Sequence, residues 1–585
     1  MKNKIIWLVL SCLMALSLVL ASCGPAVPEE EEEVAPEKEE MVKEGTWWDR
    51  METPKYGGTH INRSNSDPGV WDPFNSRFAG FFLMHLEGIG MPGFMVVDPK
   101  IFNFPTRFTP YSYQTGQLVE SWEVENWQTM TCKVREGVYW HDIPPVNGRE
   151  LTAYDIEYAW HRQFGLGSGY TEPSPWFSVT QFRLLDEVTA TGKYEIVFHL
   201  SEPSFMAIQQ LFENCTYNHI AAKEAIELWG DVNTWDRQIG TGPFILTDYV
   251  SGSSVAWVRN DNYWGYDEHY PENRLPYVDE VKTLIIPDSA TALAALRSGK
   301  IDEMDTIGWE QAESLMKTNP ELMVERSPGV EGLTLYTRVT VKPYSDINVR
   351  KALQMALDLE TIAESYYGGI PDGKPCTVMT PVGYSTPYDE WPEEVKAGYT
   401  YNPDGAKALL AEAGYPDGFK ATISAAANND LQLLQVLKAY WADINVDVEI
   451  EVKEPAAWSS YVYAGKSDFS VARWGQPWQS LPVGHFQHFM ESNPDFFCSG
   501  ISDPVYDKLF KAAEQALGPE LVKEAWRACG DHITKNHWQI TTQPTFRYYF
   551  TQPYIKNVAR TEDRTRGPRV ARLWVDQDLK TSMGR

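Results

Sequence analysis

The side chains best suited to binding a ligand lie between residues 458 and 486, in the stretch WSSYVYAGKSDFSVARWGQPWQSLPVGHF. Aromatic faces suit sugar rings, apolar side chains and cations alike. A guanidinium can bind a carboxylate through two parallel hydrogen bonds. The stretch offers three tryptophans for the first kind of contact and one arginine for the second. The candidate ligand contacts are Trp458, Arg473, Trp474, Gly475, Trp478 and Gln479.

Residues 469–473 predict a short strand that ends where the aromatic loop begins. Ligands of open α/β sheets bind beyond the carboxyl ends of strands, so we expect this loop to border a cleft. Two alternatives stay open. The chain has 22 tryptophans, most of which must pack in a core, and Arg473 could pair with an acidic neighbour instead of a ligand.

A second candidate for chemistry is the pair His141 and Asp142, at the end of the segment GVYWHD. General acid–base catalysis would need a nucleophile or a second base nearby, and the segment supplies neither. We therefore interpret the pair as a turn with a side-chain cap.

The elements that must position these side chains alternate between strands and helices. Residues 244–249 and 255–259 predict a hairpin, and residues 281–286 a third strand. A helix capped by Asp288 or Ser289 should follow and end at Gly299. Residues 301–304 then start a strand that would complete a β-helix-β unit with a right-handed crossover.

The second half of the chain carries clear helix signals. A helix is expected from Asp346, another after the cap Asp358, and a third where Asn402 precedes Pro403. Further helices are predicted at 431–443, 503–515 and 519–535, and strands at 446–452 and 557–575.

Several segments resemble the solute-binding protein family 5 of ABC importers, the oligopeptide- and dipeptide-binding group. They include GTGPF at 240–244, VRNDNYWG at 258–265, LVESWE at 118–123 and YNPDGAKALLAEAGYP at 401–416. The resemblance implies an α/β fold of the periplasmic-binding-protein type, class II, with two lobes and an extra domain in lobe I. Lobe I would comprise 46–82, 189–305 and 553–585, its extra domain 83–188, and lobe II 306–552, with crossings near Asp305 and Gln552.

The resemblance also bears on the ligand. The opening SDPGVWDP, residues 66–73, resembles a loop that borders the family's cleft, so Trp71 becomes a candidate contact, with plain packing as the alternative. Peptide-binding relatives carry an aspartate in the 458–486 region that pairs with the peptide α-ammonium. Aligned on the family's pattern, Gln479 stands there instead, and a shift by one or two residues would place Trp478 or Pro477 there, neither of which is acidic. Because a buried ammonium needs a counter-charge, this departure argues against recognition of a free N-terminus.

The N-terminal residues have the features of a targeting signal. Residues 1–22 have a basic start and an apolar stretch too short to span a bilayer, as in a signal peptide. The sequence LASC resembles a lipobox, which would make Cys23 the lipidated first residue of the mature protein. The alternative is an ordinary signal peptide with Cys23 incidental. Residues 23–45 are acidic and proline-containing and should form a disordered tether.

The formal charge of −29, from 80 acidic and 51 basic residues, argues against nucleic acid as a partner. Besides Cys12 and Cys23 the chain has Cys132, Cys215, Cys376, Cys498 and Cys529, without a C-x-x-C pair, so we expect no metal site. We expect a disulfide between Cys498 and Cys529, which flank two helices.

The expected function is therefore that of an extracytoplasmic, lipid-anchored binding protein. It would be monomeric and without a cofactor, and it would capture a peptide or an oligosaccharide and deliver it to an ABC permease and its ATPase. Two other classes stay open, a secreted glycosidase-like enzyme and a binding protein used as a sensor or chaperone. No nucleophile elbow or zinc motif supports the enzyme.

Overall fold

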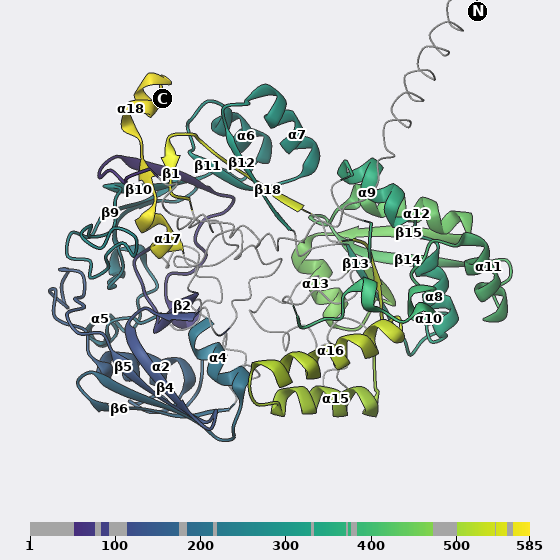
Figure 1. Ribbon diagram of the computed structural model, residues 1–585, viewed down its shortest axis with the longest axis horizontal. Coiled ribbons are helices and arrows are strands. Elements are labelled where there is room, and N and C mark those ends of the chain that lie inside the picture. The colour runs from purple at the N-terminus through teal and green to yellow at the C-terminus, as the bar shows by residue number, and fades with distance from the viewer. Residues whose placement is uncertain are drawn as a thin grey trace, which may run out of the picture. The chain divides into compact units, whose positions relative to one another are not determined.

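The structure is a computed structural model that describes residues 52–75, 84–92, 111, 114–174, 184–213, 219–328, 333–369, 373–375, 383–471, 489, 500–543, 546–558 and 566–585. Residues 51–585 form one unit, distinct from residues 1–50. Strands and helices alternate along this unit, so the mixed α/β class is confirmed (Figure 1). Among the described helices, none has the length and apolar character needed to cross a bilayer.

The first sheet has the order β1-β10-β9-β8. Strand β1 (Thr59–Ser64) pairs in parallel with β10 (Glu280–Ile285), and β9 (Ser254–Arg259) and β8 (Phe244–Val250) follow as an antiparallel hairpin. The sequence predicts β8, β9 and β10. Helix α6 (Ser289–Arg297) follows β10, and the Asp288 carboxylate caps it by accepting the backbone N–H of Thr291.

The expected β-helix-β unit does not form within one sheet. β11 (Glu303–Ile307), the strand after α6, belongs to a different sheet from β10 and pairs with β18 (Phe546–Thr551), which also pairs with β12 (Met323–Pro328). A backbone hydrogen bond from Asp302 N to Ile61 O, at 2.7 Å, joins the residue before β11 to β1. The partner strand is distant in sequence, and local patterns contain no information about it. The two crossings between lobes expected near Asp305 and Gln552 thus lie on or next to two strands, β11 and β18, that are hydrogen-bonded to each other.

A separate four-stranded sheet has the order β4-β5-β7-β6. Its strands are β4 (Val119–Glu125), β5 (Thr129–Val134), β7 (Glu195–Leu200) and β6 (Leu185–Gly192), and α2 (Ala153–Phe164) packs on them. Because β6 and β7 belong to this sheet, it extends beyond residue 188, the boundary expected for the extra domain.

One buried carboxylate explains the motifs GTGPF and VRNDNYWG. Glu87 is 1% exposed and accepts four hydrogen bonds from neutral donors. Two come from Tyr263 Oη and Trp264 Nε1, both at 2.9 Å, and two from Thr241 Oγ1 at 2.9 Å and Gln117 Nε2 at 3.0 Å. Glu87 thereby ties the end of the β8–β9 hairpin to the segment before β4. Burial raises the pKa of Glu87, and the four hydrogen bonds oppose this rise.

The largest described sheet has the order β15-β14-β16-β13-β17. Its strands are β15 (Val446–Lys453), β14 (Phe419–Ala426), β16 (Phe469–Val471), β13 (Thr334–Thr337) and β17 (Gln539–Thr541). Helices α8 (Ile347–Met355), α11 (Pro403–Glu412) and α12 (Leu431–Asp443) contribute to the core on one of its faces. Asp346, Asp358 and Asn402 cap helices, the last two as expected.

Helices α15 (Pro504–Gln515) and α16 (Pro519–Lys535) agree with the predicted ranges, but the expected disulfide is wrong. Cys529 is a free thiol on the buried face of α16, in an apolar cluster with Trp526 and Ile533, and burial raises its pKa to about 12. Cys498, Cys215 and Cys376 lie outside the described residues. Cys132 is also free and buried.

The C-terminal segment packs against the first sheet and forms a separate two-stranded sheet, not the single strand expected at 557–575. It forms β19 (Ile555–Lys556), α17 (Arg566–Arg572), β20 (Trp574–Val575) and α18 (Gln577–Ser582). Tyr554 and Trp574 join the apolar cluster of Trp71 and Trp257. The remaining described elements are β2 (Gly90–Pro92), β3 (Gln114–Gly116), α4 (Phe205–Glu213), α5 (Lys223–Trp229), α7 (Trp309–Thr318), α9 (Leu359–Tyr367), α10 (Glu393–Lys396), α13 (Pro455–Tyr463), η2 (Pro73–Asn75), η5 (Trp235–Arg237) and η6 (Tyr388–Glu390).

Candidate functional site

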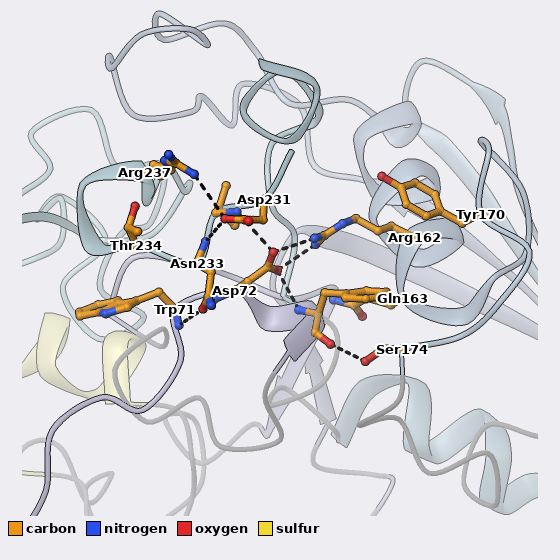
Figure 2. Close-up of polar contacts among 12 residues, drawn as sticks. Trp71, Asp72, Arg162, Gln163, Tyr170, Ser174, Asp231, Asn233, Thr234 and Arg237 are labelled. Atoms are coloured by element: carbon orange, nitrogen blue, oxygen red, sulfur yellow. Dashed lines mark hydrogen bonds and ion pairs between the residues drawn. The ribbon is translucent and has the colours of Figure 1, made fainter. Parts of the chain in front are cut away.

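The segment after β1, residues 66–75, is held by a buried ion pair. Asp72 is fully buried, and its two carboxylate oxygens accept hydrogen bonds from the Arg162 guanidinium at 2.9 and 2.7 Å (Figure 2). The same carboxylate accepts the backbone N–H groups of Phe74 at 2.9 Å and Val232 at 3.3 Å. Burial alone would lower the pKa of Arg162, but the hydrogen bonds and charge of Asp72 outweigh it and raise that pKa. The Arg162 guanidinium therefore stays charged, and its two hydrogen bonds to Asp72 hold the segment on α2.

Further polar contacts lock both ends of this segment. Asn233 Oδ1 accepts the backbone N–H groups of Trp71 at 2.9 Å and Asp72 at 3.3 Å, and the Ser174 hydroxyl donates to Phe74 O (Figure 2). At the other end, Asp67 accepts from Tyr249 Oη and from the backbone N–H of Gly252, both at 2.9 Å. The aspartates of the SDPGVWDP motif thus act as backbone anchors.

Trp71, one of the candidate ligand contacts, is 6% exposed. Its ring lies edge-on to Tyr249 at a centroid distance of 5.3 Å, in the cluster with Phe244 and Trp257. This packing matches the alternative interpretation of Trp71, and its role toward a ligand stays a prediction.

The other described candidate, Trp458, lies at the carboxyl edge of the five-stranded sheet. It is 3% exposed, packs on Ala426 and donates from Nε1 to Ser424 O at 3.2 Å. In this structure it fastens α13 to β14. The other five candidates, Arg473, Trp474, Gly475, Trp478 and Gln479, lie outside the described residues.

The sheet brings several strand ends together at this edge. β14 and β15 are parallel, and β16 pairs with β14 in the same direction, so their carboxyl ends, Ala426, Lys453 and Val471, share one side. Antiparallel pairing places the start of β13 there, and with it the end of β17, where Thr541 lies opposite Thr334. This edge is where an open α/β sheet binds a ligand.

His141 and a second buried histidine, His85, have structural contacts. His141 lies between Gly242 O, at 3.0 Å from Nε2, and Gly240 N, at 3.3 Å from Nδ1, and His85 Nε2 lies 3.1 Å from Gln238 Oε1. Burial lowers the pKa of His141 to about 4 and that of His85 to about 3, so both rings are neutral at pH 7. The His141 side chain thus connects to the backbone of Gly240 and Gly242, a structural role that replaces the expected side-chain cap.

No pattern in the sequence alone indicated the roles of Arg162 and Glu87. Arg162 lies on a helix whose apolar pattern marks the neighbouring positions, and its partner is 90 residues away. Glu87 lies in a segment without a clear period. For Asp72, the motif itself was a signal, because an aspartate before proline favours a turn.

Comparison with known proteins identifies the wider group. The family described as "Bacterial extracellular solute-binding proteins, family 5 Middle" matches residues 114–493. Heme-binding protein A of Haemophilus influenzae is 27% identical over 377 residues, which are 61% of this chain and 65% of that protein. The dipeptide-binding protein of Escherichia coli is 28% identical over 370 residues, 60% of this chain and 64% of that protein. The matches span slightly less than two thirds of these two relatives.

Among solved structures, the periplasmic binding protein DppA of Helicobacter pylori, in complex with the peptide STSA, has the same fold. The TM-score is 0.68 at 20% identity, and the match covers 89% of this chain and 99% of that one. The expectation of a two-lobed periplasmic-binding-protein fold is therefore confirmed.

Proposed function

The chain belongs to the bacterial extracellular solute-binding proteins of family 5, and on that premise we propose that it captures a small solute for an ABC importer. The observation that carries the proposal is the family match over residues 114–493. Lobe closure around a solute, followed by recognition of the closed form by a membrane permease, is a hinge motion coupled to a population shift. The energy for transport would come from a separate ATPase.

We propose the division into lobes accordingly. Lobe I holds the first sheet and the C-terminal segment, its extra domain holds the sheet of β4 to β7, and lobe II holds the five-stranded sheet. The paired strands β11 and β18 are the natural hinge, because both expected crossings, near Asp305 and Gln552, lie on or beside them. The extra domain then ends after β7, at Leu200.

A peptide is the solute that we propose first, and an oligosaccharide is the alternative. Relatives named for heme and for dipeptides show that this family accommodates different ligands. Gln479 is uncharged where peptide-binding relatives have an aspartate, so the peptide would be held through its backbone and side chains. The proposed contacts are Trp71, Trp458, Arg473, Trp474, Gly475, Trp478 and Gln479.

The decisive experiment is native mass spectrometry of the purified protein, followed by calorimetry with tri- to pentapeptides and with cello-oligosaccharides. Binding of peptides without turnover supports the proposal. Hydrolysis of either substrate class would instead favour the glycosidase-like or another enzymatic alternative. Peptide affinity that vanishes on N-acetylation would contradict the role inferred from Gln479.

We also propose that Cys23 is lipidated and that residues 23–45 tether the protein to a membrane. The support is the coincidence of LASC with an acidic, proline-containing segment. Cell fractionation of the full-length protein and of Cys23→Ala tests it. Equal membrane retention of the two proteins would exclude a lipid at this position.

A further inference from the structure

Two polar side chains at the end of β17 and just beyond it are buried without a hydrogen-bond partner among the described residues. Gln543 is fully buried, and neither its Nε2 nor its Oε1 is paired within the described part of the chain. Thr541, two residues earlier at the end of β17, is also fully buried, and its Oγ1 has no partner there either. Buried polar groups in native proteins are nearly always paired, so these three atoms call for an explanation.

The position of the two side chains is defined by β17. Ile540 belongs to the apolar core on one face of the sheet, so Gln539 and Thr541 point to the opposite face. The N–H of Thr542 donates to Leu333 O at 3.1 Å, which continues the pairing past the end of the strand. Gln543 therefore follows Thr541 on the same face, at a spacing of about 7 Å along the chain.

At the edge where the strands' carboxyl ends meet, the described side chains of this face on β17, β13 and β16 are uncharged. Charged side chains of the same face, such as Glu451 and Lys453, belong to β15 at the opposite end of the sheet. Gln539 donates to Tyr336 Oη at 2.9 Å, and Ser470 and Ser424 occupy the same face on β16 and β14. An unpaired carboxamide here can donate two hydrogen bonds and accept others. A neutral group with one donor and one acceptor matches it, and the main-chain amide of a peptide is such a group.

We propose that Gln543, assisted by Thr541, binds a main-chain amide of the peptide ligand. The inference rests on the proposed function and adds a contact to it that depends neither on the ligand's termini nor on its side chains. It accords with the neutral Gln479, since both positions suit recognition without a buried ammonium.

A second buried glutamine supplies the matched control. Gln354 on α8 is also fully buried, but its carboxamide is paired twice with the same strand, donating to Thr541 O at 3.1 Å and accepting from Thr541 N at 2.9 Å. Replacing Gln354 by leucine removes two satisfied bonds and leaves two backbone groups unpaired. Replacing Gln543 by leucine removes a side chain that has no bond to lose in the ligand-free protein.

The test measures unfolding of the ligand-free protein in urea and the affinity for the best binder of a tri- to pentapeptide library, free and with both termini blocked. Gln543→Leu should keep or raise the urea midpoint and weaken both forms of the peptide about tenfold, and Thr541→Val should weaken them several-fold. Gln354→Leu should lower the midpoint.

Two results overturn the inference while the proposed function stands. One is wild-type peptide affinity in Gln543→Leu. The other is a loss of stability in Gln543→Leu as large as that in Gln354→Leu, which would make Gln543 a structural residue. A wild-type protein that binds cello-oligosaccharides but no peptide overturns the peptide-amide assignment, and one that binds neither class overturns the proposed function and the inference with it.

Discussion

Removal of the Asp72 carboxylate should strongly reduce the free energy of unfolding. In Asp72→Ala the Arg162 guanidinium, whose side chain is 8% exposed, stays buried without its counter-charge. The backbone N–H groups of Phe74 and Val232 lose their acceptor as well. Breaking one side of a buried pair typically costs about 3–5 kcal/mol, and we expect a loss of unfolding free energy in this range.

A double-mutant cycle separates the ion pair from simple packing. Arg162→Met combined with Asp72→Ala leaves no buried charge, so the double variant should be clearly more stable than the sum of the single losses implies. Urea unfolding at pH 7 gives the four free energies. As a control, Glu313→Ala breaks the exposed pair of Glu313 and Lys317 and should cost less than about 0.5 kcal/mol. A cost below about 1 kcal/mol for Asp72→Ala, or additive losses in the cycle, would refute the reasoning.

Three other predictions concern single contacts. The folded pKa of His141 is lowered to about 4, so the stability that this neutral ring contributes is complete above pH 6.5 and is lost as pH falls toward 4. Wild-type unfolding free energy should therefore fall by up to about 1.4 kcal/mol for each pH unit in this range because of His141, and His141→Gln should not show this part of the fall. Urea unfolding at pH 7 and 5.5 measures it, and the same pH dependence in both proteins would contradict the prediction. Glu87→Gln replaces a carboxylate oxygen by an NH2 group that faces hydrogen-bond donors, and it should lower the unfolding free energy by about 1–3 kcal/mol. Because the folded pKa of Glu87 is raised, the wild-type unfolding free energy should fall as pH rises above 4.5, and the variant should not show this part of the fall. Trp458→Phe loses the bond to Ser424 O and should lower the unfolding free energy by about 1 kcal/mol, with an undiminished thermal midpoint as the contrary result.

Helices and strands whose signals lie within a few neighbouring residues could be predicted, whereas contacts between segments far apart in the sequence could not. Asp288, Asp358 and Asn402 lie directly before the helices they cap, so the signal and the structure share the same few residues. The pairing of β11 with β18 joins segments more than two hundred residues apart, and nothing in either segment names the other.

The candidate site shows the same division. The SDPGVWDP motif marked Trp71 and Asp72, but whether the tryptophan faces a cleft or a core depends on Tyr249 and the cluster around it. No sequence pattern pointed to Gln543, because an unpaired side-chain amide can be recognised only from its three-dimensional surroundings. The loop from Arg473 to Gln479 remains a prediction based on residue chemistry and family resemblance.

The composition of the cluster around Trp257 sets an order for folding. It joins residues near the start of the described chain, such as Trp71, to Tyr554 and Trp574 near its end. On the ribosome this core cannot close before the last thirty or so residues have been made, whereas the five-stranded sheet draws its strands from one continuous stretch and can assemble earlier. Closing so long a loop also slows the step, since the chain must find contacts of very high sequence separation. A chain that stops before residue 570 lacks the last members of this cluster, among them Val570 and Trp574, so part of its apolar surface would face water and favour aggregation.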